Sequence, residues 1–117
     1  MIRPARRVEK PWGHEEIWAE TARYVGKVLA IRKGHRLSLQ HHEVKDETLR
    51  VSTGQLQVEL EDAQGVMQVL VLGPGDIVRI APGRRHRMLA LEDVDVFEVS
   101  TPELDDIVRH EDDYGRS

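Results

Sequence analysis

The sequence predicts an all-β fold, a barrel or sandwich of short strands. Two observations predict it. Short β-prone runs alternate with Gly, Pro and Asp turn signals through most of the chain, and residues 56–61 alternate apolar and polar side chains with a period of two. At 117 residues the chain has the length of one domain, which we expect to span residues 1–117.

The first strands are expected on either side of two turns. Pro11-Trp12-Gly13 is typical of a turn, and residues 16–19 form the first expected strand. Residues 24–32 form the second, which ends at the turn Lys33-Gly34. Residues 37–41 are short and alternating, which indicates a third strand.

The middle of the chain contains the clearest hairpin. Residues 49–52 are expected to form a strand that runs to Gly54. The alternating run 56–61 is followed by Asp62-Ala63-Gln64-Gly65, a typical hairpin turn, and by the mostly apolar run 66–72. These two runs are therefore expected to pair as antiparallel neighbours.

Three more strands complete the predicted series. Gly73-Pro74-Gly75-Asp76 turns the chain into the short apolar run 77–80, which Pro82-Gly83 ends. The last two expected strands are 87–91 and 94–99.

The C-terminal residues differ in character from this series. Thr101-Pro102-Glu103 is typical of a helix start, with a capping Thr and Pro at the first position. We expect core strands over about 15–100 and a tail over 101–117, helical to about His110.

Composition narrows the class of protein. The net charge is −4 and the chain has no cysteine, so disulfides, thiolate metal sites and cysteine nucleophiles are excluded. No run of about 18 apolar residues is present, and the basic start Met1–Lys10 is not followed by an apolar stretch, which favours a cytoplasmic protein without a membrane span. The short basic runs lack aromatic partners, so we expect no nucleic-acid binding.

Four side chains are expected to converge on one metal ion. Gln40 and His42 lie two apart on an expected strand, so their side chains share one face. Glu47 follows across a turn, and His86 follows Pro82-Gly83. Two imidazoles, a carboxylate and an amide oxygen suit one divalent ion: zinc first, with manganese, cobalt, nickel or iron(II) also suited.

These residues carry a resemblance to the cupin superfamily. Gln40, His42 and Glu47 within Gly34–Gly54 resemble the first cupin motif, with Gln in place of the usual first His, and Gly75–His86 resembles the second. Nearly the whole chain is similar to the cupin domain of type II phosphomannose isomerases. The matching segments are Pro11-Trp12-Gly13, Leu37–Gln40, His86-Arg87, Asp105–Arg109 and Glu111–Arg116.

The resemblance implies a jelly-roll barrel and a metal-dependent isomerase. The implied reaction interconverts mannose 6-phosphate and fructose 6-phosphate through an enediolate, in a homodimer paired through an edge strand. Glu98 is the expected base, and Arg87 is a second catalytic candidate. The residues expected to bind the sugar phosphate are Lys27, Lys45, Arg109 and Arg116.

The sequence is compatible with more than one function. Lys45 and Thr48 depart from the family pattern around Glu47, which is compatible with a different sugar phosphate. The motifs would also suit an iron(II) oxygenase or another cupin enzyme, or a non-catalytic module that binds metal or sugar. His41 and Glu43 are further candidates for the base, although strand alternation points His41 away from the face of Gln40 and His42.

Overall fold

Two antiparallel sheets form the molecule. The computed structural model describes residues 2–117, and this range contains strands and turns but no helix. The first sheet has the order β1 (Arg6–Lys10), β2 (Gly13–Glu20), β3 (Val25–Ile31), β10 (Val94–Ser100), β5 (Glu47–Thr53) and β8 (Ile77–Ile80). The second has the order β11 (Val108–Glu111), β4 (Leu39–His41), β9 (His86–Ala90), β6 (Leu56–Glu61) and β7 (Met67–Leu72).

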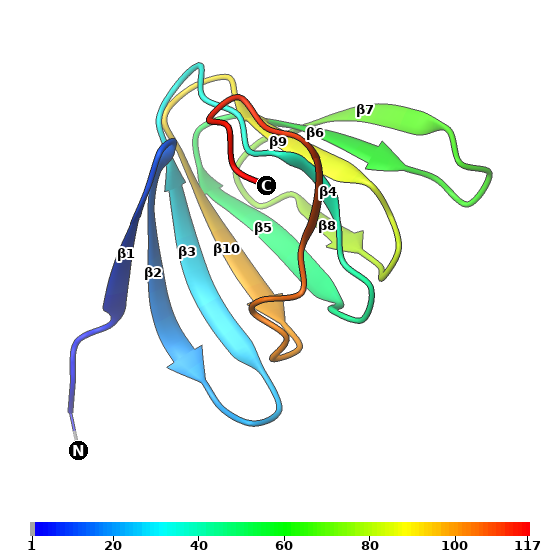
Figure 1. The fold of residues 1–117 in the computed structure, drawn as a ribbon. Coiled ribbons are helices and arrows are strands. Elements are labelled where there is room, and N and C mark those ends of the chain that lie inside the picture. Colours follow the sequence, from blue (N-terminus) through cyan, green and yellow to red (C-terminus); the bar gives the residue numbers. More distant parts are fainter. Residues whose placement is uncertain (1) are drawn as a thin grey trace.

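Strands far apart in the sequence are neighbours in both sheets. β10 lies between β3 and β5, and β9 lies between β4 and β6 (Figure 1). The two sheets face each other, and the β6–β7 hairpin extends beyond them (Figure 1). This arrangement confirms the predicted all-β barrel.

Strand alternation places both the apolar core and the buried charges on the inner faces. In β10, Val94 and Val96 point inward and are followed on the same face by Glu98, which is only 3% exposed. In β5, Leu49 and Val51 belong to the core, and Glu47 lies on their face. On the inner face of each of these two strands, one end is therefore apolar and the other end has a carboxylate.

The N-terminal strand is a correction to the predicted boundaries. The expected first strand, 16–19, is part of β2, which begins at Gly13 and pairs with the unexpected β1. Gly13 has a φ of 152°, and a Cβ there would collide with the carbonyl oxygen of Ala30. The predicted turn at Pro11-Trp12-Gly13 therefore exists, and it joins two strands.

The predicted C-terminal helix is wrong. Residues 102–106 form turns, with the Leu104 N–H donating to the Pro102 carbonyl, and β11 then pairs with β4. A helix over so few residues would have little stability of its own, so hydrogen bonds to the barrel decide the conformation of this segment. The carboxylate of Asp106 makes three such bonds, to the N–H groups of residues 43–45.

Residues 2–117 contain no helix that is long and apolar enough to cross a membrane.

Candidate active site

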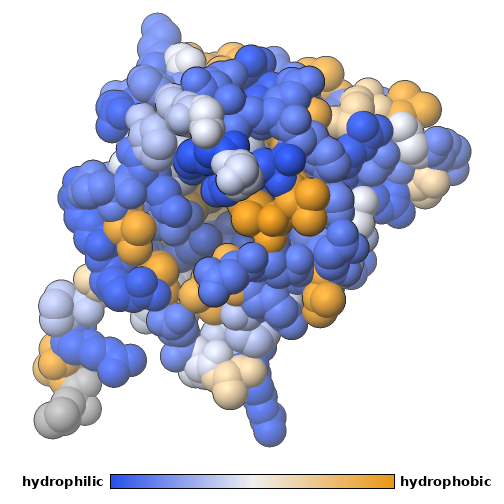
Figure 2. Space-filling model, viewed as in Figure 1, coloured by the Kyte–Doolittle hydropathy of each residue, from blue (hydrophilic) through white to orange (hydrophobic). Residues whose placement is uncertain are grey.

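A cavity of about 560 Å³ opens between the two sheets and the tail segment, residues 101–117. Its walls combine apolar side chains such as Leu29 and Met88 with charged ones from both sheets. Figure 2 shows this face of the molecule, which is mostly hydrophilic and is hollowed near its centre. The volume is in the range of small-molecule sites.

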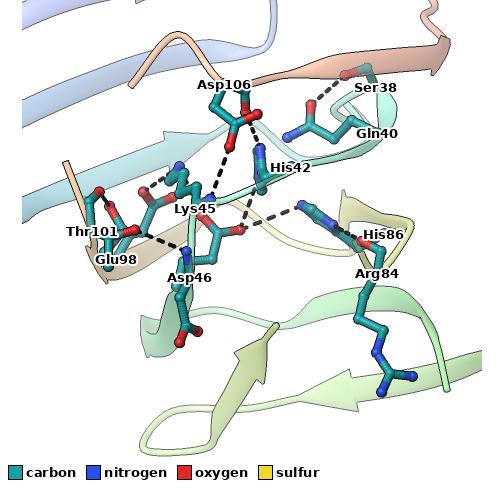
Figure 3. Close-up of polar contacts among 12 residues, drawn as sticks. Ser38, Gln40, His42, Lys45, Asp46, Arg84, His86, Glu98, Thr101 and Asp106 are labelled. Atoms are coloured by element: carbon teal, nitrogen blue, oxygen red, sulfur yellow. Dashed lines mark hydrogen bonds and ion pairs between the residues drawn. The ribbon is translucent and has the colours of Figure 1, made fainter. Parts of the chain in front are cut away.

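Three potential metal ligands meet at the polar end of this region. His42 follows β4, Glu47 begins β5 and His86 begins β9, and one ligand atom from each lies within 4.8 Å of the others. The Glu47 Oε1 atom is 3.6 Å from His42 Nε2 and 3.5 Å from His86 Nε2 (Figure 3). All three side chains are buried.

The hydrogen bonds of the two histidines leave the inward nitrogens free. His42 Nδ1 lies 2.6 Å from the Asp106 carbonyl oxygen, and His86 Nδ1 lies 3.0 Å from the Arg84 carbonyl oxygen. Because a carbonyl only accepts, each Nδ1 carries a proton, and in the neutral form of the ring each Nε2 keeps its lone pair. Within residues 2–117 both Nε2 atoms are buried without a hydrogen-bond partner, which is the arrangement of imidazoles prepared for a metal.

Gln40 lies beside this cluster. It pairs with His86 across the β4–β9 ladder, and its side chain lines the cavity. Its Oε1 accepts a 2.5 Å hydrogen bond from the Ser38 hydroxyl. A half-turn of the amide would exchange its oxygen and nitrogen while Ser38 keeps a bond, because a hydroxyl both donates and accepts. In that rotated orientation Gln40 would offer its amide oxygen to the same site.

A buried network of alternating charges continues from the cluster. Lys45 Nζ lies 2.9 Å from Glu47 Oε2 and 3.1 Å from Glu98 Oε2 (Figure 3). Lys27 Nζ lies 3.7 Å from the same Glu98 oxygen and 3.1 Å from Glu15 Oε2. Lys27 and Lys45 are thus both engaged with carboxylates inside the cavity wall.

This environment shifts the pKa values of Glu47 and Glu98 in opposite directions. Burial raises the pKa of Glu98, and the charge of Glu47 raises it further. Burial also acts to raise the pKa of Glu47, but the nearby imidazole of His42 and the ammonium of Lys45 lower it below its usual range. Burial opposes the charge of Lys45, yet Glu98 and Glu47 raise its pKa. Glu47 is accordingly the charged carboxylate and Glu98 the one that takes up a proton more easily.

Cationic side chains line the outer part of the cavity. Arg116 makes a two-pronged contact with Asp112, at 2.9 and 3.0 Å, and its guanidinium carbon lies 5.5 Å from the Tyr114 ring centroid. Arg109 Nη1 donates to the Ser117 carbonyl oxygen, and its Nε is buried with no partner within residues 2–117. Arg109 and Arg116 both line the cavity, as their predicted role requires.

Comparison with known proteins decides the family. Residues 2–112 match the model of the family described as mannose-6-phosphate isomerase C-terminal. The chain belongs to this family.

Curated relatives of this member of the mannose-6-phosphate isomerase C-terminal family are much longer proteins. The xanthan biosynthesis protein XanB of Xanthomonas campestris pv. campestris (strain B100) is 34% identical over 117 residues, which are 96% of this chain and 24% of XanB. The mannose-1-phosphate guanylyltransferase ManC of Salmonella typhimurium is 31% identical over 116 residues, 95% of this chain and 23% of ManC. The chain therefore spans about a quarter of the length of these relatives.

Solved structures agree with the predicted cupin jelly roll. KdgF from Halomonas sp. has a TM-score of 0.74 and 27% identity, and the match covers 86% of this chain and 89% of that one. The capsular polysaccharide assembling protein CapF from Staphylococcus aureus has a TM-score of 0.76 at 18% identity, covering 92% of this chain and 34% of CapF, which is a likeness of fold alone.

Two predicted positions of this family member lie outside the cavity. Arg87 is buried, donates from Nε to the Leu37 carbonyl at 2.9 Å and contacts Glu111, so it anchors the tail segment and does not line the cavity. His41 points outward, as strand alternation predicted, and contacts His110 and Glu43.

Sequence reasoning missed the contribution of β1. Arg6, Val8 and Lys10 line the cavity along one face of that strand, and Glu15 follows on β2. Their spacing of two residues is the signal that would have found them, but the run of charged residues around them obscured the strand.

Proposed function

We propose that this chain is a metal-dependent aldose–ketose isomerase that interconverts mannose 6-phosphate and fructose 6-phosphate. The observation that carries the proposal is the convergence of His42, Glu47 and His86 on one point, with both histidine Nε2 atoms free. The cluster lies beside a cavity that also holds a buried acid and several cations. The family match supports sugar-phosphate chemistry for such a site.

The residues present fit a divalent ion, with zinc the expected one. His42, Glu47 and His86 would hold it, and Gln40 would add its amide oxygen. Nitrogen and oxygen donors of this kind suit zinc, manganese, cobalt, nickel and iron(II). Such an ion supplies a positive charge that stabilises negative charge developing on the two sugar oxygens.

Glu98 is the proposed base. Isomerisation removes the proton from C2 of the open-chain aldose and returns it to C1 of the enediolate, while a proton passes from O2 to O1. A carboxylate whose pKa is raised above its ordinary value is a stronger base for both transfers. Glu98 lines the cavity, and the ammonium groups of Lys45 and Lys27 both contact its Oε2 atom.

The phosphate is proposed to bind at the outer cations. Arg109 offers guanidinium donors that match phosphate geometry, and Arg116 offers those that its contact with Asp112 leaves free. Lys10 lines the same cavity and forms no ion pair with an acidic side chain of residues 2–117, so its charge is free for an anion. Lys27 and Lys45 already contact carboxylates, so we propose that they act at the acid–base end of the site.

The arginines proposed to bind phosphate also distinguish this function from the alternative functions. An iron(II) oxygenase or a metal-binding module has no use for a phosphate-binding group, so Arg109→Ala would leave such a function intact. An enzyme for another sugar phosphate would need Arg109 but would not turn over mannose 6-phosphate.

The test is a coupled assay for fructose 6-phosphate formed from mannose 6-phosphate. The protein is stripped with chelator and refilled with zinc, manganese, cobalt, nickel or iron(II) in turn. We expect metal-dependent turnover that is lost in His42→Ala and falls by about 10²-fold or more in kcat/KM in Arg109→Ala. Arg50→Ala, an exposed arginine of β5 outside the cavity, is the matched control. A folded, metal-loaded protein without turnover would remove this substrate pair.

We further propose that the chain forms a homodimer through the edge strand β7. Val69 and Val71 are 62% and 59% exposed, and β7 is paired on one side only. Unpaired edges with apolar side chains favour pairing with a second copy.

A further inference from the structure

Lys45 occupies a position between the candidate metal cluster and the candidate base. Its ammonium touches one oxygen of Glu47 and one oxygen of Glu98, at 2.9 and 3.1 Å. The lysine is 5% exposed, so water does not compete for these contacts. Among the described residues, Lys45 is the only lysine or arginine with an ion pair to Glu47, and Figure 3 shows its ammonium beside Glu98 as well.

The two oxygens of Glu47 face different partners. Oε1 lies 3.6 Å from His42 Nε2 and 3.5 Å from His86 Nε2, so it points to the centre of the cluster. Oε2 lies against Lys45. A carboxylate in this orientation offers a metal one oxygen and keeps the other for the ammonium.

We propose that Lys45 is a positioning residue that restricts Glu47 to a single-oxygen metal ligand and leaves a coordination position for the sugar. This inference depends on the metal site of the proposed function. It replaces the sequence-based prediction that Lys45 binds phosphate, because the lysine already has two carboxylate partners.

The chemistry needs such a restriction. An aldose–ketose isomerase has to bind two adjacent sugar oxygens, so protein atoms must not fill every position around the ion. A carboxylate that binds through both oxygens would take one of those positions. Lys45 prevents this by holding Oε2, and its link to Glu98 fixes the base relative to the same carboxylate.

The test compares cobalt(II) binding to the wild-type protein and to Lys45→Met. Removing the ammonium frees Oε2 and removes a repelling charge, so we expect the dissociation constant for cobalt(II) to fall by at least about tenfold. We also expect the visible absorption bands of the bound cobalt to change, since they report its ligand number. Thermal unfolding of each variant checks that the protein is folded.

Lys27→Met is the matched control. It removes a second buried lysine from the same network, but Lys27 contacts Glu15 and Glu98 and has no contact with Glu47. We expect its cobalt affinity and absorption bands to equal those of the wild type. If Lys45 only supported the fold, Lys45→Met would lower stability as Lys27→Met does. The absorption bands of cobalt bound to it would then equal those of the wild type.

The outcomes separate the inference from the proposed function. A wild-type protein that binds no cobalt overturns the metal site itself. A wild type that binds cobalt, with unchanged bands or weaker binding in a folded Lys45→Met, overturns only the role of Lys45. If Lys45→Met does not fold, Lys45→Met with Glu98→Gln removes one charge of each sign and serves in its place.

A crystal structure of the cobalt-loaded wild-type protein tests the same point without a variant. We expect Glu47 bound through one oxygen, with Lys45 on the other. Two bound oxygens would overturn the inference.

Discussion

The backbone carbonyl of Asp106 accepts a 2.6 Å hydrogen bond from His42 Nδ1, so the tail segment orients a candidate metal ligand. The carboxylate of Asp106 holds the same turn through the N–H groups of Glu43, Val44 and Lys45, at 2.8 to 3.0 Å. One residue outside the cluster thus fixes both the ring of His42 and the loop that leads to Glu47.

Replacing Asp106 by Ala is expected to weaken metal binding by about tenfold without removing any ligand. The carboxylate bonds are lost, the tail segment separates from residues 43–45, and the orientation of His42 is less restricted. Titration with cobalt(II) measures the effect. Asp95→Ala, an exposed acid of β10 whose side chain makes no hydrogen bond within residues 2–117, is the control and is expected to bind as the wild type does. Equal affinity in the two variants would contradict this role of Asp106.

Stability is expected to fall in acid because of the tail carboxylates. Three backbone N–H donors lower the pKa of Asp106 from 3.8 to about 2, and the Arg116 side chain lowers that of Asp112 to about 2. Because the folded pKa values are depressed, their contribution is complete above the unfolded value and disappears as the pH falls from about 3.8 to about 2.

Melting temperatures measured in metal-free buffer across this interval check the prediction. The wild type should lose stability steeply between about pH 4 and about pH 2, and the Asp106→Asn, Asp112→Asn double variant should have a flatter profile. Parallel profiles would show that other groups cause the acid loss.

Replacing Leu49 by Ala is expected to be among the substitutions that lower the free energy of unfolding most. Leu49 is 0% exposed at the centre of β5, between the two sheets. Leu49→Ala should lower the free energy of unfolding by about 2–5 kcal/mol, because it removes buried methyl groups and leaves a cavity. Val99→Ala, which is 54% exposed on β10, should change it by less than about 0.5 kcal/mol. Urea denaturation measures both values, and similar losses would contradict the assignment of the core.

Charges on β7 are expected to break the proposed homodimer. Val69→Lys with Val71→Lys places two ammonium groups on an unpaired edge, which opposes pairing with a second copy. Light scattering after size exclusion should give the mass of a monomer for this variant and of a dimer for the wild type. Val99→Lys, on a strand paired on both sides, is the control. A wild-type monomer would overturn the proposed dimer.

The sequence was most informative where short-range patterns determine structure. The alternation over residues 56–61 predicted β6 with its observed bounds, and the turn at residues 62–65 joins it to β7 as expected. The two cupin-like motifs that contain His42, Glu47 and His86 predicted that these side chains meet, and they do.

Predictions failed where distant contacts decide the outcome. The residues after Thr101 have a helix-start pattern, but pairing with β4 and the bonds of Asp106 make them a turn and a strand. The sequence shows that Lys45 is charged but does not show which carboxylate it contacts. Glu98 becomes its neighbour only because β10 pairs with β5. The guanidinium of Arg87 would suit a catalytic role as well as a structural one. Only the fold shows that it donates to the Leu37 carbonyl.

The placement of β10 between β3 and β5 has a kinetic consequence. Residues 25–31 pair with 94–100, so the first sheet closes only after most of the chain has been gathered, and topologies of this kind fold on a scale of about milliseconds to seconds. Glu47 and His86 belong to different sheets and meet only when both are in place. A metal ion would therefore find its full set of ligands late in folding, and its binding should slow unfolding more than it speeds folding.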